Sequence, residues 1–369
     1  MIDNTALLQQ CITLHTARIS DSAILHRQPV RLPADFDFQK VDGMLLGLAV
    51  VDALGEPTEG MDSHDREARY GEVRDYLPAH RKDLGSIGAG TDDTQLAFWS
   101  VERLIEDGGL VPDSLLSALS SEHIVGIGGA VHQSLANYRE GLPWQIAGVN
   151  SMGNGALMRI APVILRYLQH PHPSLYADAA LGAMITHNSP GNLAACVAFI
   201  DLLWQLLART SLPEPEWWIE TFCSTVRDLE GGARYAPRAP AYAGYSGPLA
   251  PYVREVCLKA LERRTPVVEA CSTWYSGAYL METVPSALYI LALHGHDVET
   301  AIIRAVNDTR DNDSIAAIVG AAAGALHGLA GIPDRWLKEL SGRIRAEKGE
   351  HIFRLLVRAR RTFWLKYTS

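Results

Sequence analysis

Two short runs of acidic and hydroxyl residues are the parts of this sequence best suited to chemistry. The first is Gly90-Thr91-Asp92-Asp93-Thr94, and the second is Asp311-Asn312-Asp313-Ser314. Each stands directly before a segment with helical periodicity, where such residues commonly cap the unpaired N–H groups of the first turn. Capping explains one acidic residue per helix. However, each run carries two carboxylates, and Asp308 adds another ahead of the second run.

Carboxylates gathered in one place repel one another, and a hard cation relieves that repulsion. Carboxylate and hydroxyl oxygens are ligands that suit Mg²⁺ or Mn²⁺. The two runs therefore predict a metal site if they meet in space, which their spacing alone does not show. An EF-hand calcium loop starting at Asp311 is excluded, because its sixth position is Ala316 rather than Gly and its twelfth is Ala322 rather than Glu.

Three weaker signals lie between the two runs. The segment Gly126-Ile127-Gly128-Gly129 is interpreted as a turn, because no strand precedes it and the glycine spacing does not fit a dinucleotide loop. The turn 151–155 could present backbone N–H groups to an anion. His187 follows a helical segment and borders a loop, although a lone histidine is more often structural.

Composition and charge restrict the classes of protein to which the chain can belong. The 369 residues are 47% hydrophobic and 20% charged, which is ordinary for a folded protein. The net charge is −9 and no Lys/Arg stripe is present, so nucleic-acid binding is not expected. The five cysteines form no C-x-x-C pair, and neither a signal peptide nor an apolar run of membrane-spanning length is visible. A cytoplasmic protein with no membrane partner is expected.

The elements that must position these residues are helices. Met44, Leu45, Leu48 and Val51 recur at helical spacing, and strand alternation is scarce. We predict one all-α domain over residues 41–369, preceded by an N-terminal extension, or arm, over residues 1–40. Beyond the helices at Met44 and after Thr94, the pattern predicts helices over residues 113–120, 156–169, 175–186, 192–209, 215–228, 252–263, 283–294, 298–306, 314–328, 334–346 and 350–366. The stretches 55–91 and 230–250 are predicted to be long loops, which tend to be functional.

Six motifs, in order, resemble those of the ADP-ribosylglycohydrolases, the family of dinitrogenase-reductase-activating glycohydrolase and its relatives. The resemblance covers about residues 43–328. The motifs are Gly47 to Gly55 with Pro57 and Glu59, Thr91 to Thr94, Gly153 to Gly155 with Met158, Arg159 and Pro162, Thr186 with His187, Gly277 to Tyr279 with Glu282 and Thr283, and Asp311 to Ser314 with Ile315 and Ala316.

The resemblance implies a compact multi-helix hydrolase with two Mg²⁺ (or Mn²⁺) ions, which cleaves the N- or O-glycosidic bond between ADP-ribose and a side chain, with arginine favoured. Asp92 or Asp313 would be the general base, and Glu59 matches an acidic residue that guards the site in some members. By position, the implied metal ligands are Thr91, Asp92, Asp93, Asp311, Asp313 and Ser314, and the implied ADP-ribose contacts are Asn154, Gly155, His187 and Tyr279 at the outer wall.

Two departures from the family pattern stand out. The family's Gly-Gly-Asp-Thr-Asp-Thr is Thr309-Arg310-Asp311-Asn312-Asp313-Ser314 here. This change keeps every oxygen ligand, is expected to stiffen the loop, and places Arg310 as a candidate phosphate contact. The family's Gly-Asp pair is Val51-Asp52.

The added arm resembles that of a bacterial immunity branch of the family. There the extension can plug the active site of an ADP-ribosyltransferase toxin while the hydrolase domain reverses the modification. Two alternatives stay open: an immunity protein, or antitoxin, that acts mainly by occluding the toxin, and a hydrolase of a free small ADP-ribose-like molecule.

Overall fold

The computed structural model describes residues 3–81, 84, 86–345 and 351–365. Among these residues the extended pairings are isolated bridges only, so the all-α prediction is confirmed. The α-helices are α1 (Thr5–Thr13), α2 (Gln39–Gly55), α3 (Ser63–Tyr70), α4 (Asp92–Asp107), α5 (Pro112–Ser121), α6 (Gly129–Arg139), α7 (Trp144–Ala147), α8 (Ser174–Met184), α9 (Pro190–Ala208), α10 (Pro215–Leu229), α11 (Leu249–Arg263), α12 (Val267–Thr273), α13 (Leu280–His294), α14 (Val298–Asp308), α15 (Ser314–His327), α16 (Asp334–Glu339) and α17 (Ile352–Phe363).

Several predicted boundaries were wrong. The helix expected over 156–169 is two 3₁₀ helices, Leu157–Arg159 and Ala161–Tyr167, and Pro162 stands at the start of the second without an N–H to donate. The stretch 55–91, expected to be a loop, contains α3, whose first turn is capped by the Asp62 carboxylate. Helices α6, α7 and α12 were not expected, and α16 ends at Glu339, several residues earlier than predicted.

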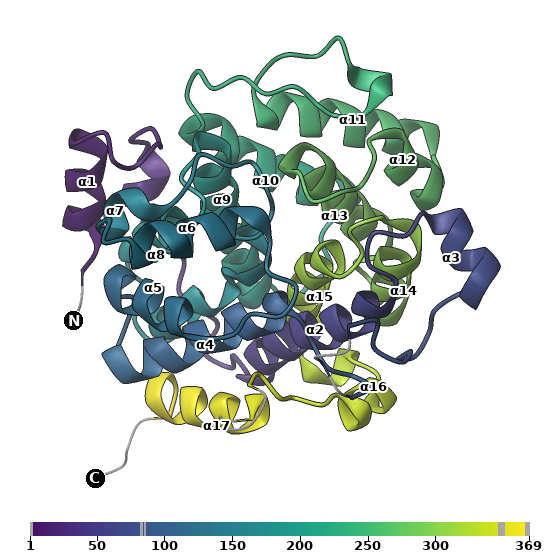
Figure 1. Cartoon of the computed structure of the whole chain (residues 1–369), viewed down its shortest axis with the longest axis horizontal. Coiled ribbons are helices and arrows are strands. Elements are labelled where there is room, and N and C mark those ends of the chain that lie inside the picture. The colour runs from purple at the N-terminus through teal and green to yellow at the C-terminus, as the bar shows by residue number, and fades with distance from the viewer. Residues whose placement is uncertain (1–2, 82–83, 85, 346–350, 366–369) are drawn as a thin grey trace.

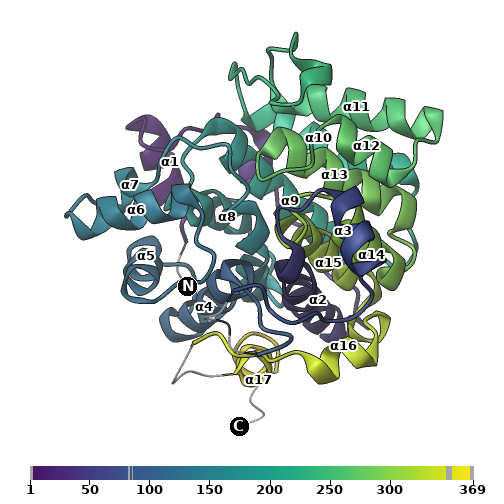
Figure 2. The same cartoon turned by 45° about the vertical axis from the view of Figure 1, so that its right-hand side comes forward.

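The centre of the fold is an antiparallel pair, α2 and α15, with the most extensive contact between any two described helices. Both helices lie inside the ring formed by the others (Figures 1 and 2). Glycines let their backbones touch: a Cβ at Gly47 would lie 2.3 Å from the Gly320 carbonyl oxygen, and a Cβ at Gly324 would lie 2.0 Å from that of Gly43. The two helix backbones therefore lie closer together than any residue larger than glycine would allow at these positions.

The most apolar long helix, α9, belongs to the core. It has 19 residues and could cross a membrane by length and composition alone, but 89% of the relevant window is buried inside the protein. Helix α9 packs between α8 and α10. Its composition therefore reflects burial in the core.

The N-terminal arm lies against the helical body. Helix α1 packs on α8 with Leu8 buried, and the Asn4 amide donates to the buried Asp178 carboxylate at 2.6 Å. Further along, the Trp204 indole donates to the Val30 carbonyl at 2.8 Å. The arm is thus docked at both ends, on the side of the molecule where α8 lies (Figure 1).

The close helix pair predicts the effect of one added methyl group. Gly47→Ala should lower the free energy of unfolding by about 2–3 kcal/mol, because the methyl group overlaps the backbone of α15. Guanidinium chloride denaturation measures the change. Gly232→Ala is the control, since no atom lies within 4 Å of its added Cβ, and it should change stability by less than about 0.5 kcal/mol. Equal stability of the two variants would contradict the packing described.

Candidate metal and substrate site

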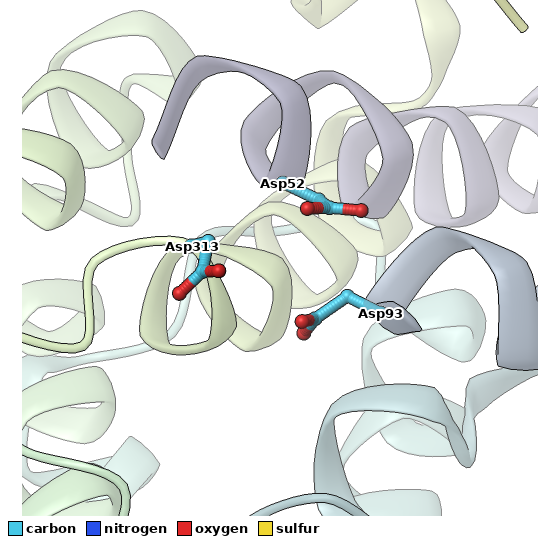
Figure 3. Close-up of side chains that lie close together, drawn as sticks. All are labelled: Asp52, Asp93 and Asp313. Atoms are coloured by element: carbon cyan, nitrogen blue, oxygen red, sulfur yellow. The ribbon is translucent and has the colours of Figure 1, made fainter. Parts of the chain in front are cut away.

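The two acidic runs meet at the end of the α2–α15 pair. Helix α4 begins at Asp92, and Asp313 is the N-cap residue of α15. Asp52 on α2, Asp93 on α4 and Asp313 each offer a carboxylate oxygen within 4.8 Å of the others. Figure 3 shows these three carboxylates, from three helices, around one common space.

A second group of carboxylates shares one member with the first. Oxygens of Glu59, Asp311 and Asp313 also lie within 4.8 Å of one another. Asp313 therefore stands between the two groups. Asp308, the extra carboxylate ahead of the second run, pairs with Arg304 at 3.2 Å and does not join either group.

Asp52 was not among the predicted site residues, yet it fixes the first run. Its buried carboxylate accepts from the Thr91 N–H at 2.8 Å, the Thr91 hydroxyl at 2.7 Å, the Thr94 N–H at 3.0 Å and the Thr94 hydroxyl at 2.5 Å. These four bonds set the orientation of the first turn of α4. The available signal was a single carboxylate in the apolar segment Gly43 to Gly55.

The second run is held by amide side chains. The Asn154 amide donates to Asp311 at 2.5 Å and to the Thr283 hydroxyl at 3.0 Å. The Asn312 amide donates to the Thr58 hydroxyl at 2.9 Å, so Asn312 supports the loop. The Ser314 hydroxyl donates to Asp93 at 3.2 Å, which joins the second run to the first.

A buried arginine that the sequence reasoning missed ties the two acidic loops together. Arg66, on α3, donates to the Thr58 hydroxyl at 3.0 Å, beside Glu59. It also donates to the carbonyls of Asn307 at 2.7 Å and Thr309 at 2.9 Å, ahead of Asp311. The surrounding sequence is polar and unremarkable, so nothing in it marks Arg66 for this role.

Above the carboxylates lies a cavity of about 550 Å³, within the range of small-molecule sites. Thr91 and Asp93 lie beneath its floor, both buried, and do not line it. The predicted site residues that line the cavity are Glu59, Asp92, Asn154, Gly155, His187, Tyr279, Asp311, Asp313 and Ser314.

The walls of the cavity are joined by backbone bridges, Val149 to His187 and Gly153 to Tyr279. The turn at 151–155 was expected to present free backbone N–H groups to an anion, but two of these groups are not free. The Asn154 N–H donates to the Ala278 carbonyl at 2.9 Å, and the Gly153 N–H donates to the Ser151 hydroxyl at 3.0 Å. Those two N–H groups are engaged within the protein.

Burial dominates the electrostatics of the acidic cluster. It raises the pKa of Asp92, Asp93 and Asp313 well above the ordinary value, and the neighbouring carboxylates add to the rise. Burial likewise raises the pKa of Asp52 and Asp311 to about 6. Such groups cannot all ionise together unless a cation compensates them.

The residues present fit a divalent cation. Asp93 Oδ1 is buried and has no hydrogen-bond partner among the described residues, although a buried carboxylate oxygen is normally paired. The carboxylate groups around it offer oxygen atoms as ligands, and Mg²⁺ and Mn²⁺ prefer oxygen ligands. The cluster can therefore bind metal, with Asp93 and Asp313 central to it.

His187 is a neutral residue of the cavity wall. Burial, with a smaller contribution from Arg159, lowers its pKa to about 3. Nδ1 lies 3.0 Å from the Thr186 hydroxyl, and the ring rests against Gly155, where a Cβ would lie 3.0 Å from Cε1. A neutral imidazole at this place can hydrogen-bond a ligand but does not carry a positive charge at neutral pH.

The family model, a curated relative and a solved structure that match this chain all carry descriptions of ADP-ribosyl hydrolases. The family model described as ADP-ribosylglycohydrolase matches residues 33–363. An uncharacterised protein of Archaeoglobus fulgidus is 32% identical, covering 83% of this chain and 92% of its own length. An ADP-ribosylarginine hydrolase of Pseudomonas putida is 27% identical, covering 82% and 74%. A solved ADP-ribosylglycohydrolase-related protein complex is 27% identical with a TM-score of 0.61, covering 88% and 97%.

The bonds made by Asp52 predict a defect in metal binding. Asp52→Asn turns one carboxylate oxygen into an amide donor that faces the donors of Thr91 and Thr94. The affinity for Mn²⁺, measured by titration calorimetry, should fall by about 10–100-fold, as for other residues that orient metal ligands. Asp42→Asn, on the same helix, is the matched control. Equal Mn²⁺ affinity in the two folded variants would show that Asp52 does not position the site.

Proposed function

Because the chain belongs to the ADP-ribosylglycohydrolase family, whose members cleave glycosidic bonds to ADP-ribose, we propose that it removes ADP-ribose from arginine side chains of proteins with the help of Mg²⁺ or Mn²⁺. The single observation that carries the proposal is the meeting of the two acidic runs at the floor of a cavity. Arginine is favoured because the Pseudomonas putida relative is an ADP-ribosylarginine hydrolase.

The proposed metal ligands are the oxygens of Thr91, Asp92, Asp93, Asp311, Asp313 and Ser314. Two ions are supported by the two carboxylate groups that share Asp313. When bound, such ions would hold the ribose hydroxyls and activate a water molecule.

The protein's own groups supply the rest of the proposed mechanism. The carboxylate of Asp92 or Asp313 accepts the proton of the attacking water at its free oxygen. As the bond to the guanidine breaks, positive charge develops on the ribose, and the carboxylates at the cavity floor stabilise it. Glu59 lies beside Asp311 and Asp313, and its Oε2 is paired with Arg81 Nη2 at 2.5 Å, so this carboxylate is held at the edge of the centre.

Contacts on the cavity walls would orient the substrate. The neutral His187 and the backbone at Gly155 face the ligand from one side, and Tyr279, half-buried, forms the outer wall. The amide of Asn154 keeps Asp311 in place through a 2.5 Å hydrogen bond. The adjoining bridges at Val149 and Gly153 limit movement of these walls.

Release of ADP-ribose from an arginine-ADP-ribosylated protein tests the proposal. Release should require Mg²⁺, stop in excess EDTA, and fall by about 10³-fold in Asp92→Ala and Asp313→Ala, because each removes charge stabilisation at the reacting centre. Asp308→Ala is the control, since that carboxylate faces Arg304 outside the cavity. Near-normal turnover in both site variants would refute the assignment. Turnover of free ADP-ribose-like molecules alone would favour the small-molecule alternative.

A second proposed role is immunity to an ADP-ribosyltransferase toxin that the arm contacts. It is supported by two apolar side chains on the docked arm, Leu14 and Val30, which are 62% and 59% exposed.

All five cysteines are free and buried, which suits the cytoplasm, where we place the protein.

Point variants test the arm better than deletion, since deletion would remove the buried Leu8 and expose the face of α8 on which α1 packs. Leu14→Glu should weaken binding of a candidate ADP-ribosyltransferase by about tenfold or more, because burying the new charge at an interface is costly. Val268→Glu, at an exposed apolar residue on α12 and outside the arm, is the control. Biolayer interferometry measures both. Unchanged toxin affinity in Leu14→Glu and Val30→Glu would contradict the proposed contact.

A further inference from the structure

The cavity carries an unusual balance of charge for a ligand that contains phosphate. Its described lining includes four carboxylates, and the one cationic side chain among the described lining residues is Arg238. His187 is neutral, and two N–H groups of the neighbouring turn are engaged elsewhere. A diphosphate carries two negative charges, and hydrogen bonds from a cationic group to phosphate oxygens are stronger than those from neutral donors.

Arg238 is presented to the cavity by a buried carboxylate. Its Nε donates to Glu282 Oε1 at 2.8 Å, and its Nη2 donates to Glu282 Oε2 at 2.5 Å. Glu282 is 0% exposed, whereas the Arg238 side chain is 56% exposed. One edge of the guanidinium is therefore fixed, and Nη1 has no hydrogen-bond partner within the described part of the chain.

Two aromatic rings also pack against the Arg238 guanidinium. Its carbon lies 5.2 Å from the ring centre of Tyr279 and 5.9 Å from that of Tyr275. Tyr275 has a φ of 80° and Ser276 a φ of 46°, a strained conformation for residues other than glycine. Such strain persists where surrounding contacts hold it, and it is frequent at ligand sites.

The arginine expected from the sequence to meet a phosphate is engaged elsewhere. Arg310 donates to Asp62 at 2.7 Å and also lies over the Tyr275 ring, with 4.8 Å between its guanidinium carbon and the ring centre. It is not among the cavity-lining residues. Arg238, from the long loop 230–250, lines the cavity instead.

We propose that Arg238 is the specificity-determining residue that binds the diphosphate of ADP-ribose. The free edge of a guanidinium held on Glu282 is suited to two parallel hydrogen bonds with phosphate oxygens. The inference rests on the proposed function, because it names the part of the same substrate that this residue recognises. It also gives a role to loop 230–250, because Arg238 is the one residue of this loop among the described residues that line the cavity.

Binding and turnover of the full-length protein with Mg²⁺ test this inference. Arg238→Gln should raise the dissociation constant for ADP-ribose by about 10–100-fold, as expected for losing charged hydrogen bonds. The KM for an arginine-ADP-ribosylated peptide should rise similarly, with kcat within about threefold. Arg234→Gln, in the same loop and bonded only to the Ser246 carbonyl among the described residues, is the control and should leave both constants unchanged.

Two further variants keep the test decisive if the buried Glu282 carboxylate destabilises Arg238→Gln. Arg238→Lys keeps the charge but loses the planar fork, and Arg238→Gln combined with Glu282→Gln removes both charges. Both should lose ADP-ribose affinity. Wild-type affinity in either folded variant would overturn the inference. So would a parallel loss of kcat and Mn²⁺ affinity, which indicates a structural role. A folded wild-type protein that binds no ADP-ribose would instead overturn the proposed function and the inference with it.

Discussion

The backbone contact between α2 and α15 is the constraint on which the rest of the site depends. At its end, a Cβ on Gly55 would lie 2.6 Å from the Cα of Asp313, so the second acidic run is pressed against the last turn of α2. Asp52, one turn earlier, then lies beside Asp93 and Asp313. A wider helix pair would move two of the three carboxylates apart, and no side-chain adjustment of an aspartate is long enough to restore the group.

Bringing these carboxylates together is electrostatically unfavourable, and hydrogen bonds from neighbouring residues hold them in place. Burial alone disfavours the ionised forms of Asp92, Asp93 and Asp313. Threonine hydroxyls, an asparagine amide and the buried Arg66 hold the loops so that the carboxylates cannot separate and relax. A site held in this way is pre-organised for a cation, because binding relieves repulsion without further rearrangement.

The sequence predicted the local features of the site better than its assembly. Acidic and hydroxyl residues at helix starts are visible in the residue types, and α4 and α15 do begin at the two runs. Their meeting depends on contacts between residues more than 200 positions apart, such as Ser314 with Asp93, which periodicity does not contain. Asp52 left a detectable signal, a charge within an apolar helix. Arg66 and Arg238 left none, because the residues next to each arginine do not distinguish a guanidinium at the site from one on the surface.

A crystal structure of the protein with Mn²⁺ and ADP-ribose would test the central claim most directly. Anomalous manganese peaks are expected at the two carboxylate groups that share Asp313, with ADP-ribose in the cavity against the wall formed by His187 and Tyr279. Manganese peaks remote from the acidic cluster, or ADP-ribose bound outside this cavity, would contradict it.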